Sequence, residues 1–197
     1  MFKLVKSFFM FTLMCSLVGH VLAAEPTEQE AKSDAFVSGI PLDQPIDTFN
    51  VLAVSGPSKG RTLCYACQYG GKPVIAVFFK KIDKPVVELL AAVNETAHSF
   101  ENKKLRAFGI YLTDEPDSAR SELEKLAAEH GWENLPLTVY DGEEGPVNYQ
   151  IKDRAAVNVM MWVKARVKAN HAYQSLDELT KKERQQILQD TEKILPQ

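Results

Sequence analysis

The hydrophobic positions of the chain change between two kinds of spacing from residue 49 onwards. Residues 73–79 form a continuous run of mainly β-branched and aromatic side chains, which is typical of a strand buried on both faces. Similar runs, bounded by turn residues such as Gly and Pro, predict further strands at residues 49–54, 105–112 and 135–140, and a hairpin at residues 157–163 and 167–173.

Helical spacing lies between and after these strands. A helix is predicted behind Asp83, which can cap it, because the following apolar residues recur at helical intervals: Val86, Leu89, Leu90, Val93 and Ala97. A second helix is predicted from Pro116 to a stop at Gly131. A third is predicted to begin at residues 180–183, which read Thr-Lys-Lys-Glu and match a capping box.

This order of elements predicts an α/β fold. Strands that alternate with helices are expected to be parallel and joined by right-handed crossovers. The terminal hairpin adds antiparallel strands at one edge. We therefore expect a mixed central β-sheet with helices on both faces.

The amino terminus has the three parts of a secretory signal. Lys3 and Lys6 supply the positive start, residues 8–18 the apolar stretch, and residues 21–24 the small-residue cleavage zone. The apolar stretch is too short to span a bilayer, and acidic, polar sequence follows it. We expect a cleaved signal peptide over residues 1–23, with an uncleaved anchor as the alternative.

The domain organisation follows from this signal. Residues 24–47 contain isolated prolines and acidic residues without an apolar period, so they are interpreted as a flexible leader. Residues 48–197 then form the folded domain, in a protein that is periplasmic or secreted.

Composition and charge exclude some classes of binding partner. The 197 residues are 45% hydrophobic and 25% charged, the balance of an ordinary globular protein. The net charge of −3 becomes −5 when the signal peptide takes Lys3 and Lys6 with it, so no general basic field attracts nucleic acid. No apolar run of about 18 residues occurs after residue 24, so no membrane span is expected once the signal is removed.

Two cysteines carry the candidate chemistry. Cys15 lies in the signal, and the large residues Leu13 and Met14 before it argue against a lipoprotein cleavage site. Cys64 and Cys67 are then the only cysteines of the mature chain, and in an oxidising compartment they are expected to form a disulfide.

Three interpretations of this disulfide remain open. A small ring closes little loop entropy, so it adds little stability and is easily reduced, which favours a redox-active pair. Arg61 and Lys72 are nearby in sequence and could favour a thiolate, as could a short helix opened by the turn itself. The alternatives are a local structural clasp, or a metal site, which needs ligands beyond two thiolates.

The order of elements and the single Cys-x-x-Cys resemble the thioredoxin-like superfamily, in its redoxin branch of exported TlpA-like proteins and AhpC/TSA peroxiredoxins. Residues 135–142 (Leu-Pro-Leu-Thr-Val-Tyr-Asp-Gly) and 145–151 (Gly-Pro-Val-Asn-Tyr-Gln-Ile) resemble the redoxin stretch before the terminal hairpin. Secreted variants with Cys-Tyr-x-Cys ahead of the first core strand are the most similar. The resemblance covers residues 48–195 and implies a thioredoxin-like three-layer sandwich.

The resemblance also implies a function, thiol-disulfide exchange with protein thiols or disulfides. In the family's usual order Cys64, taken as the more exposed, attacks a partner disulfide and Cys67 resolves the mixed disulfide. We expect no cofactor and no metal. Whether the protein is an enzyme, a thiol-disulfide oxidoreductase, stays open.

Two departures from thioredoxins support a rival reading. Residues 80–84, where thioredoxins carry their cysteines at the start of a helix, contain none, and residues 154–158 lack the proline beside the active disulfide. The rival is a non-catalytic thioredoxin-like binding module with a structural disulfide. A third hypothesis is a Cu(I)-binding, chaperone-like protein, by resemblance to the copper-carrying branch of the fold. His171 would then be the third copper ligand beside the two cysteines, although it is more simply interpreted as an ordinary strand residue.

Overall fold

The computed structural model describes residues 36–196. Their strands are β1 (Val51–Ala53), β2 (Thr62–Leu63), β3 (Val74–Phe79), β4 (Arg106–Thr113), β5 (Leu137–Asp141), β6 (Val157–Val163) and β7 (Arg166–Tyr173). Their α-helices are α1 (Tyr65–Tyr69), α2 (Lys84–Ser99), α3 (Pro116–His130) and α4 (Lys181–Gln189). Short 3-10 turns are η1 (Glu101–Lys103), η2 (Val147–Tyr149), η3 (Leu176–Glu178) and η4 (Asp190–Lys193).

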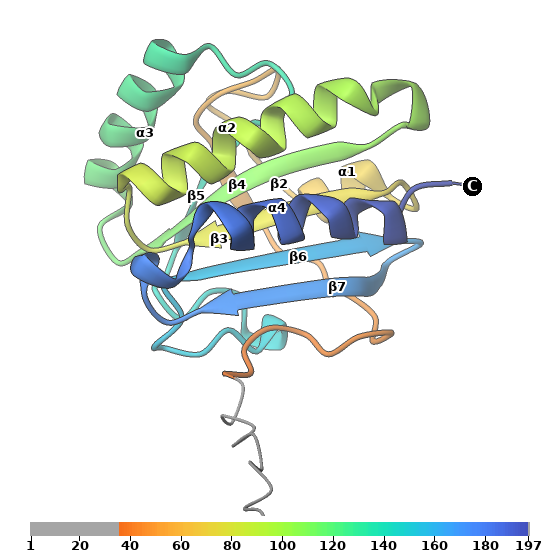
Figure 1. Ribbon diagram of the computed structural model, residues 1–197. Helices are drawn as coiled ribbons and strands as arrows, with labels where there is room; N and C mark the ends of the chain where they lie inside the picture. The colour runs from red at the N-terminus through yellow and green to blue at the C-terminus, as the bar shows by residue number, and fades with distance from the viewer. Residues whose placement is uncertain (1–35, 197) are drawn as a thin grey trace, which may run out of the picture. The chain divides into compact units, whose positions relative to one another are not determined.

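The strands form one mixed sheet in the order β2-β1-β5-β4-β3-β6-β7 (Figure 1). β3 pairs parallel with β4 and antiparallel with β6, and β4 pairs parallel with β5. All six residues of β3 are buried, as the continuous apolar run at residues 73–79 predicts for a central strand. The predicted α/β class, with parallel crossovers and an antiparallel hairpin at one edge, is confirmed.

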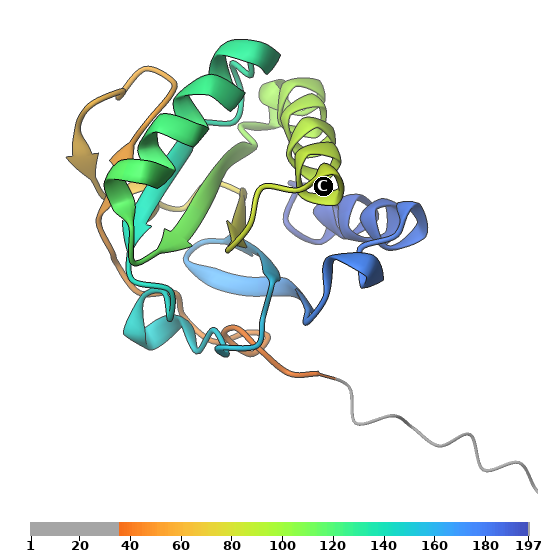
Figure 2. The same cartoon turned by 90° about the vertical axis from the view of Figure 1, so that its left-hand side faces the viewer.

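Two hydrophobic cores lie on opposite faces of this sheet. Along β3, Ile75, Val77 and Phe79 face the core built with α2, α3 and α4. Val74, Ala76 and Phe78 alternate with them and face a second core, which α1, η2 and the chain before β1 complete. Figure 2 shows the three long helices together on one side of the sheet. The three-layer sandwich therefore has one thick helical layer and one thin layer.

The ends of the long helices follow the predicted signals. α2 begins behind Asp83 and buries all five of its predicted apolar residues, although the Asp83 side chain makes no capping hydrogen bond. α3 begins at Pro116 and ends at Gly131, whose φ of 60° is left-handed. At α4 the Thr180 hydroxyl accepts the Glu183 N–H at 3.3 Å, which confirms this half of the capping box.

Residues 36–47 differ from the flexible leader predicted for residues 24–47, because they pack on the domain. The Ser38 hydroxyl donates to the Asn158 side chain at 2.7 Å, and the Asn170 amide donates to the Ser38 carbonyl at 2.8 Å. Gly39, the residue after Ser38, has a φ of 91°, and a Cβ on Gly39 would lie 2.7 Å from the Asn170 side chain. This polar network joins the segment to β6 and β7, and its Ser38 and Asn158 are buried, as is the nearby Ile40.

The signal peptide predicted for residues 1–23 and the leader up to residue 35 lie outside the described residues. Within residues 36–196, none of the helices is long and apolar enough to cross a membrane.

Candidate redox site

Cys64 and Cys67 form the predicted disulfide, in the connection between the edge strand β2 and the central strand β3. Cys64 is the N-cap of α1, and the two Cα atoms lie 5.2 Å apart, within the range that a disulfide spans. Sequence reasoning allowed a short helix here, and α1 is that helix. The five residues of α1 show no helical spacing of apolar side chains, so only the four-residue turn between the two cysteines indicated this helix.

The Cys64 sulfur receives a hydrogen bond from its own helix. The Cys67 N–H donates to Cys64 Sγ at 3.0 Å, and this is the only hydrogen bond to either sulfur within the part of the chain that the structure describes. A donor aimed at a sulfur stabilises its thiolate over its thiol. Arg61 and Lys72, the two cations expected to help, make no hydrogen bond to either sulfur within the same residues.

The exposure of the two cysteines is opposite to the expectation. Cys67 is exposed, whereas Cys64 is half-buried and packs against the core on the thin side of the sheet. The expectation that Cys64 is the more exposed residue is therefore wrong. Cys64 is followed directly by Tyr65 and Ala66, which are buried in the same core.

Two tyrosines fix α1 to the sheet. The Tyr65 ring stacks on Phe108 of β4 with centroids 5.2 Å apart, and the Tyr69 ring meets Phe108 edge-on at 6.0 Å. Burial raises the pKa of both phenols above the usual value, so Tyr65 and Tyr69 stay neutral near pH 7. The two rings hold the disulfide helix against the sheet by packing.

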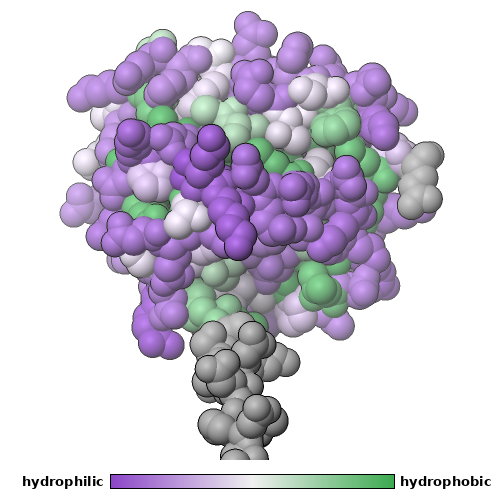
Figure 3. Space-filling model, viewed as in Figure 1, coloured by the Kyte–Doolittle hydropathy of each residue, from purple (hydrophilic) through white to green (hydrophobic). Residues whose placement is uncertain are grey.

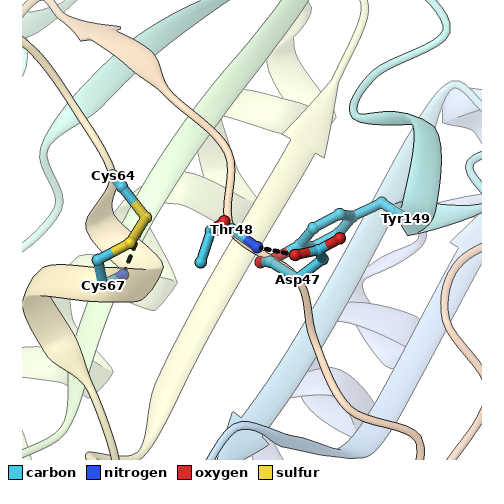
Figure 4. Close-up of a disulfide and its surroundings, with 5 residues drawn as sticks. All are labelled: Asp47, Thr48, Cys64, Cys67 and Tyr149. Atoms are coloured by element: carbon cyan, nitrogen blue, oxygen red, sulfur yellow. Dashed lines mark hydrogen bonds between the residues drawn. A yellow bond between two sulfur atoms is a disulfide. The ribbon is translucent and has the colours of Figure 1, made fainter.

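The chain before β1 passes the disulfide on its way across the thin side of the sheet. Figure 4 shows the disulfide at the start of α1, and the segment of Asp47 and Thr48 that continues towards Tyr149. The Tyr149 hydroxyl donates to the Asp47 carbonyl at 2.8 Å, and the Thr48 N–H donates to the Asp47 carboxylate at 2.7 Å. These hydrogen bonds fix the backbone of Asp47 and Thr48 beside the disulfide.

The disulfide does not occupy the usual helix-start site, which follows the last residue of β3. Cys67 precedes β3 in the chain, whereas residues 80–84 come after it. At residues 80–84 the Lys80 ammonium donates to the Asp153 carbonyl at 2.9 Å. Asn158, next to this end, is buried and bonded to Ser38.

His171 is not brought to the disulfide. It lies on β7, and its Nε2 is 3.1 Å from an Asp190 carboxylate oxygen at η4, on the face that packs against α2 and α4. Burial lowers the pKa of His171, and the Asp190 carboxylate partly offsets this. Cys64 packs against the core on the other face. The hypothesis that His171 is the third ligand of a copper site is therefore wrong. Residues 36–196 contain no cluster of three metal-ligating side chains.

The sheet order, the terminal hairpin and the position of α4 define a thioredoxin-like fold, here with one disulfide ahead of the first core strand. Three solved structures with this fold are a candidate protein disulfide isomerase from Bacteroides thetaiotaomicron, a mitochondrial 2-Cys peroxiredoxin from Plasmodium falciparum and an exposed lipoprotein thioredoxin from Streptococcus pneumoniae. Their TM-scores are 0.61, 0.58 and 0.51, at identities of 13%, 14% and 15%.

The three matches cover 81%, 78% and 73% of this chain and 93%, 94% and 99% of those chains. Identities this low establish the shared fold alone. No protein-family model and no curated protein matches the sequence. The thioredoxin-like resemblance of the sequence is thus confirmed at the level of the fold.

Proposed function

We propose that the protein carries out thiol-disulfide exchange through Cys64 and Cys67. The observation that carries the proposal is a small-ring disulfide with one exposed cysteine and one sulfur bonded to a backbone N–H, on a thioredoxin-like domain. A small ring is easily reduced, and the N–H at Cys64 stabilises the thiolate that reduction releases. The substrates are disulfides or thiols of other proteins.

The exposure of Cys67 sets the order of the two steps. In the reduced protein the Cys67 thiolate attacks one sulfur of a partner disulfide, the partner's S–S bond breaks, and the second partner sulfur leaves as a thiolate. The Cys64 thiolate then attacks Cys67 Sγ, closes the Cys64–Cys67 disulfide and releases the first partner sulfur. The partner gains the two electrons that the dithiol loses, and a dithiol reductant is needed to recharge the pair.

Export would place this exchange in an oxidising compartment. The signal predicted for residues 1–23 supports a periplasmic or secreted protein, and the expected partners are then exported proteins with disulfides.

Catalysis of insulin reduction by dithiothreitol tests the proposal. The mature chain, residues 24–197, is expected to speed precipitation of the insulin chains, because its dithiol relays electrons to the insulin disulfides. The matched control is the Cys64→Ser/Cys67→Ser double variant, which should reduce insulin no faster than dithiothreitol alone. Equal rates for the double variant and the unchanged protein would overturn the proposal.

A non-catalytic binding module with a structural disulfide is the second candidate. It is favoured by residues 80–84, which hold no cysteine, and by Asn158, whose hydrogen bond to Ser38 joins this end of the sheet to the segment at residues 36–47. Such a module would dock partners without exchanging electrons. The two candidates therefore predict different reduction potentials for Cys64–Cys67.

A further inference from the structure

A large cavity lies at the end of the sheet where β3 begins, beside the last residue of α1. Its volume is about 880 Å³, within the range of ligand-binding clefts. Its walls come from segments far apart in sequence: the end of α1 with residues 71–73, residues 102–104 after α2, the β6–β7 turn, and residues 193–196. In Figure 1, α1 and the C-terminus both lie at the right-hand side.

The cavity combines an apolar floor with a cationic rim. Tyr69, Pro73, Val163, Ile194 and Leu195 supply apolar surface. Seven of the fifteen lining residues are Lys or Arg and none is Asp or Glu, although the whole chain has more acids than bases. Figure 3 shows apolar surface beside hydrophilic side chains at the right-hand edge, the same edge as the C-terminus in Figure 1.

Four of the rim cations are available to an incoming charge. Lys72, Lys103, Lys104 and Lys164 form no ion pair within residues 36–196. Converging cations without ion-pair partners raise the local concentration of anionic groups.

The other rim cations already have partners. Lys168 pairs with Asp43 at 2.5 Å, and Lys193 pairs with Asp190 at 2.7 Å. Arg166 donates to the Asp43 carbonyl at 2.9 Å. These bonds hold the rim in place, so the four lysines without ion pairs remain to attract a ligand.

The cavity adjoins the redox site through Tyr69, the last residue of α1. Tyr69 lines the cavity. Its ring packs on the ring of Tyr65, the residue that follows Cys64, with centroids 5.2 Å apart. Tyr69 follows Cys67 by two residues in α1, so the cavity begins within one helical turn of the exposed cysteine. The chain's own leader enters at the other end of the sheet, where Phe36 lies beside Arg154, a residue that lines a cleft with Lys80.

We propose that this cavity binds an acidic segment of the partner protein, with an apolar side chain inserted between the lysines. The inference rests on the proposed exchange at Cys64–Cys67 and specifies its partner. Carboxylates of the segment would face the four lysines, and the apolar floor would take the inserted side chain. A flat anionic membrane would meet the lysines but could not fill a hollow of this volume.

Fluorescence anisotropy with a labelled ten-residue peptide tests the proposal without redox chemistry. The probe alternates glutamate with leucine and contains no cysteine; its counterpart has lysine in place of glutamate. The acidic peptide should bind the mature chain, and Lys103→Glu/Lys104→Glu should weaken binding by about tenfold or more. The control Lys181→Glu/Lys182→Glu reverses an exposed lysine pair outside the cavity lining, at the start of α4, and should not change binding.

Each outcome of this experiment decides the proposal. Selective binding of the acidic peptide that falls with added salt, and with Lys103→Glu/Lys104→Glu only, supports it. Equal binding of both peptides, or equal losses in the two lysine variants, overturns it. Binding to vesicles with anionic phospholipid but not to the peptide also overturns it, in favour of a membrane surface. If insulin reduction fails while the acidic peptide binds, the exchange function is wrong and the anionic site stands.

Discussion

Replacement of Phe108 by alanine is expected to lower the free energy of unfolding by about 3–5 kcal/mol, measured by urea denaturation. The ring is fully buried at the centre of the thin-side core, where it contacts Tyr65, Tyr69 and Trp162. The two tyrosines belong to α1, so the cavity left by the ring lies directly beneath the disulfide helix. Phe108→Ala should therefore also speed reduction of the disulfide by a small thiol.

Phe79→Ala is the matched control for this prediction. Phe79 is equally buried, but it lies in the core beneath the long helices and stacks on Tyr111 at 5.4 Å. A similar loss of stability is expected, with no change in the rate at which a small thiol reduces the disulfide under native conditions. Equal reduction rates for the two variants would show that α1 does not depend on the aromatic packing.

The second large effect concerns the two cysteines singly. Reduced Cys64→Ser protein is expected to form a stable mixed disulfide with 5,5′-dithiobis(2-nitrobenzoate), because Cys67 attacks and no second thiolate resolves the product. The unchanged protein should instead release both thionitrobenzoate groups and close its own disulfide. Mass spectrometry distinguishes the two products directly.

Cys67→Ser should react more slowly, since the remaining Cys64 is half-buried. Faster trapping by Cys67→Ser than by Cys64→Ser would reverse the order of attack. Mixed disulfides in neither variant would contradict exchange chemistry at this pair.

Much of the fold could be predicted from the sequence because its elements carry local signals. The apolar run at residues 73–79 and the helical spacing after Asp83 depend on neighbours in the chain, and both elements lie where the pattern places them. The disulfide was predictable for the same reason, since three positions separate its cysteines. Local spacing thus indicated the strands, the long helices and the disulfide.

The features that escaped prediction depend on contacts between distant residues. The packing of residues 36–47 rests on Ser38 and Asn158, which are 120 positions apart. The lysines of the cationic rim are dispersed along the chain and converge only in the folded domain. The exposure of Cys67 follows from the way Tyr65 inserts into the thin-side core. None of these contacts leaves a periodic trace in the sequence.

The reduction potential of Cys64–Cys67 tests the central claim most directly. It is measured on the mature chain by thiol trapping after equilibration in glutathione buffers. Exchange chemistry predicts a value between about −120 and −270 mV, where oxidoreductases with paired cysteines operate. A value below about −300 mV would contradict exchange and identify the disulfide as a structural bridge.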